Sequence, residues 1–262
     1  MRVGPKMRRL MEIAYLLGSE TLEGLANPYR MLAEGAGFAS PRGMDRAVRV
    51  LRQEGWAKES PADASEKASW VFELSGKGLE DLMDGIDPEV EWGREWNGLW
   101  STVSFDLPSE ARVERRQLEL WLRKRRFGHL QGSLWISPRA YGDWGVELSE
   151  RHVDPRRLVF QESRAVGMLR DDDYVRKGWN FDRIGQCYRD YMDFLDTRPS
   201  AAVGSEQAIS WWFEQESRLW KLAFESDPFL PISLYPNGYL GKEAWQRRKA
   251  AFRRIAEEMS QA

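Results

Sequence analysis

Residues 96–139 read WNGLWSTVSFDLPSEARVERRQLELWLRKRRFGHLQGSLWISPR, and this stretch decides how the middle of the chain folds. β-Branched and aromatic residues over 100–107 predict a strand, which Pro108 ends. The run over 109–126 starts with residues that favour a helix start and contains no Gly or Pro, so it predicts a helix. Short apolar runs bounded by glycines then predict two further strands, His129–Leu130 and Ser133–Ser137.

A strand, a helix and two strands form the first half of a βαββαβ ferredoxin-like unit. Leu158–Val166, which reads LVFQESRAV, predicts a later strand of the same unit. We therefore expect a ferredoxin-like middle domain over residues 96–168. Helical patterns fill most of the chain on both sides of it, so the expected fold class is α+β and multidomain.

Length, composition and charge limit the class of protein. The chain has 262 residues, more than a single domain usually has, and 42% of them are hydrophobic, so two or three packed domains are expected. No apolar run approaches about 18 residues and no signal peptide is visible, so we expect no membrane segment. Cys187 is the only cysteine, which excludes an intrachain disulfide and predicts a cytoplasmic protein. Because the net charge is −2, nucleic-acid binding would have to rest on local basic patches.

Residues 1–84 predict three helices followed by a β-hairpin, which describes a winged helix-turn-helix domain. Glycines separate the helices, and the polar loop PADASEKAS separates the two strand-like runs. A short helix closes the domain. The expected helices are Pro5–Leu17, Leu25–Glu34, Ser40–Glu54 and Leu79–Met83, and the expected strands are Trp56–Ser60 and Trp70–Leu74.

The third of these helices has two opposed faces. Ser40 is a good N-cap, and Pro41 suits the first helical position. At about 100° per residue, the apolar residues gather on one side and three arginines and a glutamine on the other. Exposed arginines can pair with guanine edges in the major groove or hold phosphates, although an ordinary helix with a solvated basic face is the alternative. The apolar residues are Met44, Ala47, Val48 and Leu51, and the candidate DNA contacts are Ser40, Arg42, Arg46, Arg49 and Gln53.

The hairpin supports DNA binding less well than the helix does. A wing that grips phosphates should be positive, but residues 56–68 carry Lys58 and Lys67 against three acids, a net charge of −1. We therefore expect the wing to contribute little, or to act only through its tip residue Lys67, which completes the candidate DNA contacts.

Two stretches beside or within the middle domain carry strong charge. Residues 85–95 (GIDPEVEWGRE) combine Gly, Pro and acids without periodicity, and they predict a linker. The helix expected over 112–126 holds seven Lys or Arg against Glu114 and Glu119, densest in RKRR at 123–126. It could hold DNA backbone, an acidic partner surface or nucleotide phosphates. It could equally be a solvated helix C-terminus, where cations suit the macrodipole.

Residues 172–262 predict a mainly helical C-terminal domain. Its aromatic residues recur at helical spacings, so they could line an apolar ligand pocket or simply form the core. Several cations nearby could meet the phosphates of such a ligand, among them Lys221, Arg247 and Arg248. The candidate effector-binding residues are Trp179, Trp211, Trp220, Arg218 and Tyr235.

Two motifs connect the sequence with a known family. SFDLP at 104–108, followed by the basic helix and FGHLQGSLWISPR at 127–139, resembles the middle domain of PaaX-type transcriptional repressors. Nearer the C-terminus, DPFLP at 227–231 followed by LYPNGYLG at 234–241 resembles the C-terminal signature of that family. The two motifs stand in the order that the family has, and the resemblance covers nearly the whole chain.

The resemblance implies a winged-helix DNA-binding domain and a repressor that leaves its operator when it binds an aryl-acyl-CoA, phenylacetyl-CoA being the family's effector. We therefore expect a cytoplasmic repressor of an aromatic-acid catabolic operon, with double-stranded operator DNA and an aryl-acyl-CoA as partners and no cofactor. A homodimer is expected, with the middle domain as its dimerisation element, because the strands of that domain are apolar and one winged helix reads few bases.

Other functions have weaker support. The chain has two histidines and no GxSxG, P-loop, GxGxxG or HExxH motif, so we expect no enzyme and no metal site. One alternative is a metal-dependent nuclease, because small CRISPR-adaptation nucleases, which the family's middle domain resembles, place a metal-binding carboxylate where Asp106 stands. Asp106 could instead accept backbone hydrogen bonds in the turn, and the acidic run 171–173 suits an exposed loop or helix N-terminus. The last alternative is a protein-interaction scaffold that binds no DNA.

Overall fold

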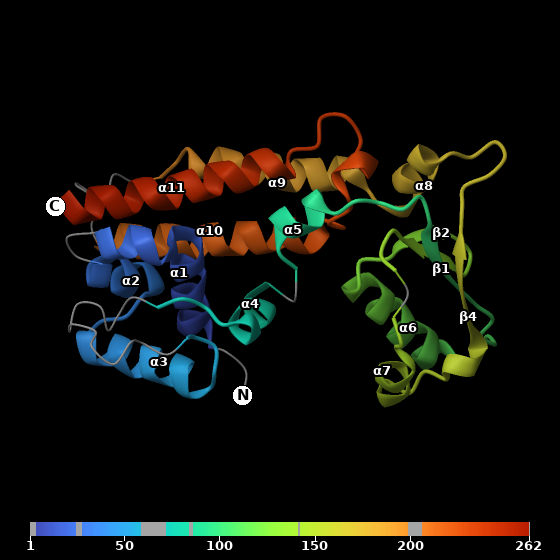
Figure 1. Cartoon of the computed structure of the whole chain (residues 1–262), viewed down its shortest axis with the longest axis horizontal. Helices are drawn as coiled ribbons and strands as arrows, with labels where there is room; N and C mark the ends of the chain where they lie inside the picture. The colour runs from blue at the N-terminus through green and yellow to red at the C-terminus, as the bar shows by residue number, and fades with distance from the viewer. Residues whose placement is uncertain are drawn as a thin grey trace. The chain divides into compact units, whose positions relative to one another are not determined.

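The computed structural model describes residues 4–24, 28–58, 72–83, 86–140, 142–198 and 206–261. The chain divides into two compact units, each assembled from segments far apart in the sequence (Figure 1). None of the helices in the described part of the chain has the length and apolar content that crossing a bilayer requires. The first unit contains residues 1–87, 186–224 and 240–262, and the second contains 88–185 and 225–239.

The second unit is built on one four-stranded sheet. Its strands lie in the order β2-β3-β1-β4, and every neighbouring pair is antiparallel. The strand, helix and two strands that the sequence predicts are present, and a second helix after β3, which the sequence pattern does not predict, completes the βαββαβ arrangement. The elements are β1 (Trp100–Phe105), α6 (Arg112–Lys124), β2 (Gly128–Gln131), β3 (Leu134–Ser137), α7 (Gly145–Glu150) and β4 (Leu158–Ser163).

Alternate residues of the sheet pack into two different cores. Val103 and Trp135, which are paired across β1 and β3, belong to a core with apolar residues of α6 and α7. Trp100 and Ile136 point to the opposite face and join Leu230, which comes from the far end of the sequence. Because successive strand residues point to opposite faces, both faces of the sheet are buried. One face is covered by residues that no local sequence pattern connects with the sheet.

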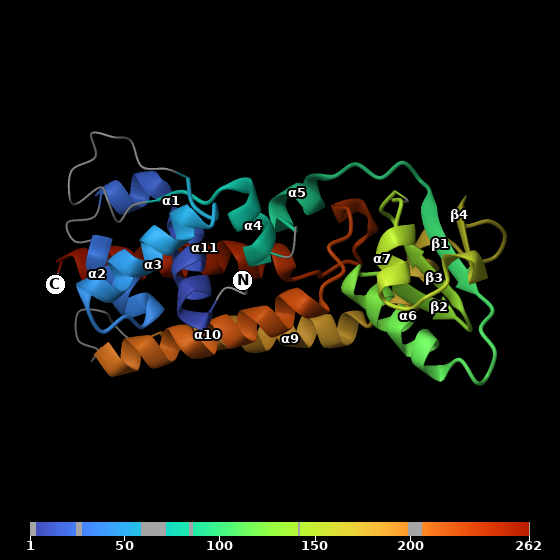
Figure 2. The same cartoon turned by 90° about the horizontal axis from the view of Figure 1, so that it is seen from below.

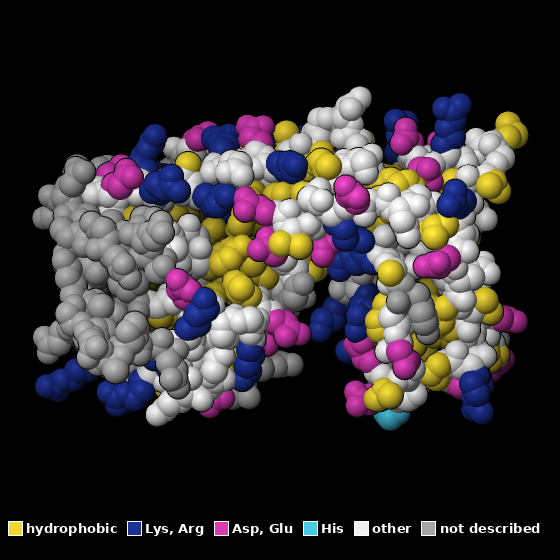
Figure 3. All heavy atoms as spheres, viewed as in Figure 1, with side chains coloured by type: hydrophobic (Ala, Val, Ile, Leu, Met, Phe, Trp, Pro, Cys, Tyr) yellow, Lys and Arg dark blue, Asp and Glu magenta, His cyan; other side chains and the backbone are white. Residues whose placement is uncertain are grey.

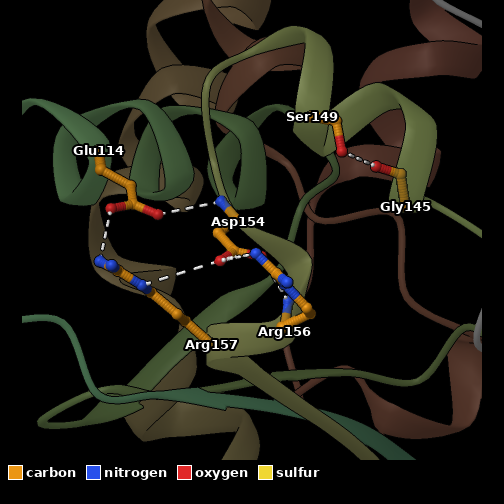
Figure 4. A network of polar contacts seen from close by, with 6 residues as sticks. All are labelled: Glu114, Gly145, Ser149, Asp154, Arg156 and Arg157. Carbon is orange, nitrogen blue, oxygen red and sulfur yellow. Dashed lines mark hydrogen bonds and ion pairs between the residues drawn. The ribbon is translucent and has the colours of Figure 1, made fainter.

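A network around Glu114 holds the chain before β4 against α6 (Figure 4). The carboxylate of Glu114 accepts a hydrogen bond from the Asp154 backbone N–H at 3.0 Å and another from Arg157 at 3.2 Å. Asp154 also accepts from the backbone N–H of Arg156 at 3.1 Å and starts the short 3₁₀ helix η2 (Pro155–Arg157). One of the two acids of α6 is thus engaged with arginine outside its own helix.

The acidic run expected at a loop or helix N-terminus begins α8 (Asp171–Gly178). The carboxylate of Asp173 accepts from the backbone N–H of Arg170 at 2.9 Å, and that of Asp171 accepts from the indole of Trp100 at 2.7 Å. These carboxylates therefore cap a helix and fix its start to β1, as negative groups at a helix N-terminus can do.

The linker predicted over 85–95 is partly wrong, because Pro88–Gly93 forms a helix, α5. Trp92 of this helix is buried; its ring centroid lies 6.0 Å from that of Phe229, and its indole donates to the hydroxyl of Tyr239 at 3.0 Å. Pro88 suits a first helical turn. A single buried tryptophan in a polar segment gives no periodic signal, and its tertiary contacts are what stabilise the helix.

The first unit is helical in its described part. Helix α1 runs beyond its predicted end at Gly18, where the chain kinks at φ 72° and then resumes as a helix. Figure 2 shows α9 and α10 side by side, and a hydrogen bond of 2.6 Å from the hydroxyl of Tyr191 to Glu216 joins them. The helices are α1 (Pro5–Gly24), α2 (Pro28–Ala36), α3 (Pro41–Gln53), α4 (Gly76–Met83), α9 (Phe181–Leu195), α10 (Glu206–Ser226) and α11 (Gly241–Gln261).

Candidate nucleic-acid interface

Helix α3 starts at the predicted cap. The backbone of Ser40 is extended at φ −155° and ψ 150°, and its Oγ accepts a hydrogen bond from the backbone N–H of Gly43 at 3.3 Å. Pro41 opens the first turn, where its missing N–H costs no hydrogen bond. Gln53 is the last helical residue. The Ser40 cap and Pro41, from which the start of this helix is predicted, are therefore also the residues at which it begins.

The two faces of α3 separate as the helical wheel predicts. Its apolar side is buried in the first unit, and its arginine side lies in solvent. An exposed guanidinium keeps all its donors available for phosphate oxygens or base edges. The buried residues are Met44, Ala47, Val48 and Leu51, and the exposed ones are Ser40, Arg42, Arg46, Arg49 and Gln53.

A tight turn joins α2 to α3. The backbone N–H of Phe38 donates to the carbonyl of Ala33 at 2.7 Å, and that of Gly37 donates to Glu34 at 3.0 Å. This pair of bonds is a Schellman motif, and Gly37 stands at its left-handed position with φ 76°. Four residues, 37–40, therefore connect two packed helices, a connection of the length found in helix-turn-helix motifs.

The wing predicted after α3 falls largely on residues 59–71, and with them Lys67 lies outside the described residues. The described stem is a single antiparallel bridge between Ala57 and Leu74. The backbone N–H of Lys58 donates to the carbonyl of Glu73 at 2.9 Å, and the two side chains form an exposed ion pair. The described residues thus show one bridge between the two predicted strands, whereas the hairpin itself and a winged contact with DNA stay predictions.

Four of the seven cations predicted on the basic helix are exposed, and the others serve the fold. Arg115 donates to the carbonyl of Leu107 at 2.7 Å, Arg125 pairs with Glu147, and Arg126 donates to the carbonyl of Asp227. Figure 3 shows Lys and Arg side chains gathered beside α6. We call the exposed set the α6 stripe; it comprises Arg112, Arg116, Arg123 and Lys124.

The DPFLP segment is organised by one buried carboxylate. Asp227 accepts hydrogen bonds from the backbone N–H of Phe229 at 2.8 Å and from the hydroxyls of Tyr235 and Tyr239. The hydroxyl of Tyr235 also accepts from the backbone N–H of Leu230 at 3.1 Å, and burial raises the pKa of Tyr235 well above its usual value. The motif therefore folds on itself and packs on the sheet, next to the 3₁₀ helix η3 (Ile232–Leu234).

A comparison with known protein families supports the ferredoxin-like fold of the second unit. Residues 93–175 match the family model described as the PaaX protein central Cas2-like domain. The middle of this chain is a PaaX central domain. The matched residues, 93–175, extend beyond both ends of the predicted middle domain, residues 96–168.

One solved structure shares the overall fold of this chain. It is an uncharacterized protein, Rv0674 from Mycobacterium tuberculosis, with a TM-score of 0.54, 17% sequence identity, and coverage of 96% of this chain and 97% of that one. No curated protein matches the sequence. The PaaX domain points to a transcriptional regulator of the PaaX type.

The candidate effector residues divide between the two units. Trp179 and Tyr235 pack beside the second core of the sheet. Trp220 is buried in the first unit, where its ring centroid lies 5.2 Å from that of Tyr191. Trp211 is 57% exposed, and Arg218 is exposed and hydrogen-bonds Gln215 at 3.1 Å. Neither unit contains all five, and their role in effector binding stays a prediction.

Two of the cations considered for a ligand phosphate are already engaged. Arg247 pairs with Asp196 at 2.6 Å, and Arg248 is buried between Glu12 and Glu216. A buried, paired guanidinium offers no donor to an incoming phosphate without leaving carboxylates uncompensated. Arg248 therefore contributes to the core of the first unit.

Asp106, the residue considered for nuclease chemistry, is exposed just beyond the end of β1. Within the ranges that the structure describes, no three His, Cys, Asp or Glu side chains lie close enough together to hold a metal ion.

Proposed function

We propose that this protein is a DNA-binding transcriptional regulator that represses an aromatic-acid catabolic operon and is released by an aryl-acyl-CoA such as phenylacetyl-CoA. The observation that carries the proposal is the exposed arginine face of α3 in a chain that contains a PaaX central domain. The functional division we propose is a winged-helix domain over 1–84, the middle domain over 96–168, and helical C-terminal segments over 172–262.

The arrangement of α3 suits the major groove. Arg42, Arg46 and Arg49 are four and three residues apart, so they project from one side of a helix. A helix of 13 residues is about 20 Å long, which allows its first turns to reach base edges while later residues meet the backbone. Arginine supports both roles because its fork of donors fits guanine and phosphate alike.

Two copies of this helix would read an operator better than one. A two-fold dimer reads two half-sites related by a dyad and spaced by about one turn of DNA or a multiple. We assign dimerisation to the PaaX domain, where β2 and β4 are the two edges of the sheet. Sheet edges carry unpaired backbone groups that a second chain can pair with.

Effector control follows from linkage. If the aryl-acyl-CoA binds the form that cannot hold DNA, DNA and ligand must weaken each other by the same factor. A tenfold release at saturation requires about 1.4 kcal/mol of coupling. The aromatic residues of 172–262 and the segment after Asp227 supply apolar surface for the aryl group in this proposal.

The test is a mobility shift with the promoter DNA of the protein's own operon. Arg46→Ala combined with Arg49→Ala should weaken binding by about 1–3 kcal/mol for each arginine that pairs with a base. The matched control is Arg253→Ala combined with Arg254→Ala, which removes two exposed arginines from α11 of the same unit. Equal affinity of the two double variants, with unchanged circular dichroism, would show that α3 does not read DNA.

A further inference from the structure

Two arginines of the second unit converge on one carboxylate. The Nε of Arg94, just after α5, lies 3.4 Å from Oε2 of Glu91, and Nη2 of Arg139, just after β3, lies 3.2 Å from the same oxygen. Arg94 also donates from Nη1 to the carbonyl of Pro138 at 3.2 Å. The arginine side chains are each 29% exposed and Glu91 is 17% exposed, so the group is only partly covered by the protein.

The charges of this group do not balance. Two guanidinium groups share one carboxylate, which leaves one positive charge in excess. The contacts with Glu91 also lack hydrogen-bond geometry: Nε and Nη2 of Arg94 and Nη2 of Arg139 are buried and make no hydrogen bond with any residue that the structure describes. Buried donors without an acceptor are destabilising, and most strongly so when they carry charge.

The electrostatics of Arg139 show the same imbalance. Burial is the largest cause, and it lowers the pKa of Arg139; the nearby charge of Arg94 lowers it further, while the contact with Glu91 and the nearby Tyr235 raise it. An anion placed between the guanidinium groups would oppose both lowering effects. Guanidinium pairs of this kind are suited to carboxylate and phosphate oxygens, which accept two parallel hydrogen bonds.

The surroundings of Arg139 are rigid and aromatic. Its carbonyl accepts from Ser101 of β1 at 2.6 Å and its backbone N–H donates to Ser137 at 3.2 Å, so its position is fixed to the sheet. Tyr235 is close enough to influence the pKa of Arg139, and its ring stacks on that of Tyr239 with centroids 3.6 Å apart. The guanidinium group thus lies beside the DPFLP–LYPNGY segment.

We propose that Arg94 and Arg139 together form an anion-binding site that takes the carboxylate or phosphate group of a small organic ligand. The site deepens the proposed effector control and rests on it for its biological role. Glu91 occupies the site in the absence of ligand and holds the arginines in place. Binding of the anion completes the hydrogen bonds that Glu91 leaves unmade and neutralises the excess charge.

Calorimetry on the full chain tests the site with four separate probes: inorganic phosphate, phenylacetate, coenzyme A and phenylacetyl-CoA. Binding of phenylacetate would assign the anion as a carboxylate, and binding of coenzyme A as a phosphate. Arg139→Gln should lower the affinity for the probe that binds by about tenfold, because one charge-assisted hydrogen-bonded pair is lost. The control is Arg156→Gln, an exposed arginine of the same unit that pairs with Asp154.

Glu91→Gln separates a ligand site from a structural clamp. Because this change removes the competing negative charge, the anion should bind several-fold more tightly than it binds the native chain. A clamp that only holds α5 to the end of β3 predicts lower stability for Glu91→Gln and no gain in affinity. This variant keeps the test decisive even if Arg139→Gln folds poorly.

The outcomes also separate this site from the proposed function. The site is overturned if no probe binds below millimolar concentration, or if Arg139→Gln and Glu91→Gln bind like the native chain. If phenylacetyl-CoA still releases DNA from Arg139→Gln with native potency, effector control stands and the site lies elsewhere. If a probe binds and responds to both substitutions but never affects DNA binding, the site stands and effector control fails.

Discussion

Arg248 of α11 donates a hydrogen bond from Nε to Oε1 of Glu216 on α10 at 2.7 Å, and both side chains are almost completely buried. Glu12 of α1 accepts a second bond from the same guanidinium, and the hydroxyl of Tyr191 donates to Glu216 at 2.6 Å. Burial is the main cause that raises the pKa of Glu216, against the charge of Arg248. One buried cluster thus ties the helix that starts the chain to helices near its end.

Replacement of Arg248 by Met should destabilise the first unit strongly. The change leaves Glu216 buried and Glu12 half-buried without a cation, and breaking such a buried pair typically costs about 3–5 kcal/mol. The comparison is Arg247→Met, whose partner Asp196 is exposed and whose loss should cost at most about 1 kcal/mol. Urea unfolding of both variants measures the difference, and similar midpoints would contradict the structural role of the cluster.

Replacement of Ser40 by Ala should weaken α3 locally. The Oγ of Ser40 satisfies the backbone N–H of Gly43, and loss of such a cap costs about 1 kcal/mol. The matched control is Ser149→Ala: Ser149 is also exposed on a helix, but its hydroxyl donates to a carbonyl and caps no free N–H. Thermal unfolding would show the difference, and a Ser149→Ala variant that is equally destabilised would argue against the cap.

Replacement of Asp227 by Ala should unfold the DPFLP segment. The tyrosine hydroxyls and the N–H of Phe229 lose their common acceptor, at a cost of at least about 2 kcal/mol. The exposed Asp182→Ala serves as the control. Tryptophan fluorescence should report the change through Trp92, which bonds Tyr239. An unaltered spectrum and midpoint would mean that the carboxylate does not organise the segment.

The ion pair between Arg125 and Glu147 should fail in acid. Burial raises the pKa of Glu147, but the hydrogen bond and charge of Arg125, with Arg151, outweigh it and leave the pKa below its usual value. A lowered folded-state pKa gives stability that is present above the unfolded value, about 4.3, and is lost as the pH falls through the folded value. Glu147→Gln should therefore lower the urea midpoint near pH 7, and the difference should shrink as the pH falls below the unfolded value of about 4.3.

The control for this prediction is Glu150→Gln, which changes an exposed acid of the same helix α7. Its midpoint should follow that of the native protein at both pH values. A difference between Glu147→Gln and the native protein that persists in strong acid would show that shape or packing, and not the charge of Glu147, is responsible.

The α6 stripe should hold DNA phosphates if it forms part of the DNA-binding surface. Arg112→Gln combined with Arg116→Gln would then reduce the slope of log affinity against log salt by about 0.9 for each phosphate that is no longer neutralised. Arg176→Gln combined with Lys177→Gln on α8 removes two other exposed cations of the same unit and should leave the slope unchanged. An unchanged slope in the α6 variant would make the stripe a solvated face.

Local patterns in the sequence were sufficient for the central sheet and for α3. Strand residues, turn residues and a Ser-Pro cap act over a few neighbouring positions, so β1, α6 and α3 could be located within a few residues of their bounds. The order β2-β3-β1-β4 also follows once the unit is seen as βαββαβ. The opposed faces of α3 are a consequence of helical geometry alone.

These local patterns could not predict long-range contacts. Helix α5 exists because Trp92 packs on residues near 229 and 239, and the excess charge at Arg94 and Arg139 arises where the ends of α5 and β3 meet. Glu12 and Arg248 are 236 positions apart in the sequence, and no local sequence pattern around either residue predicts that they pair. The sequence by itself determined most of the helices and strands and which face of α3 is basic. Tertiary packing decided whether α5 forms and which charges are buried together, since both depend on distances that no periodic pattern encodes.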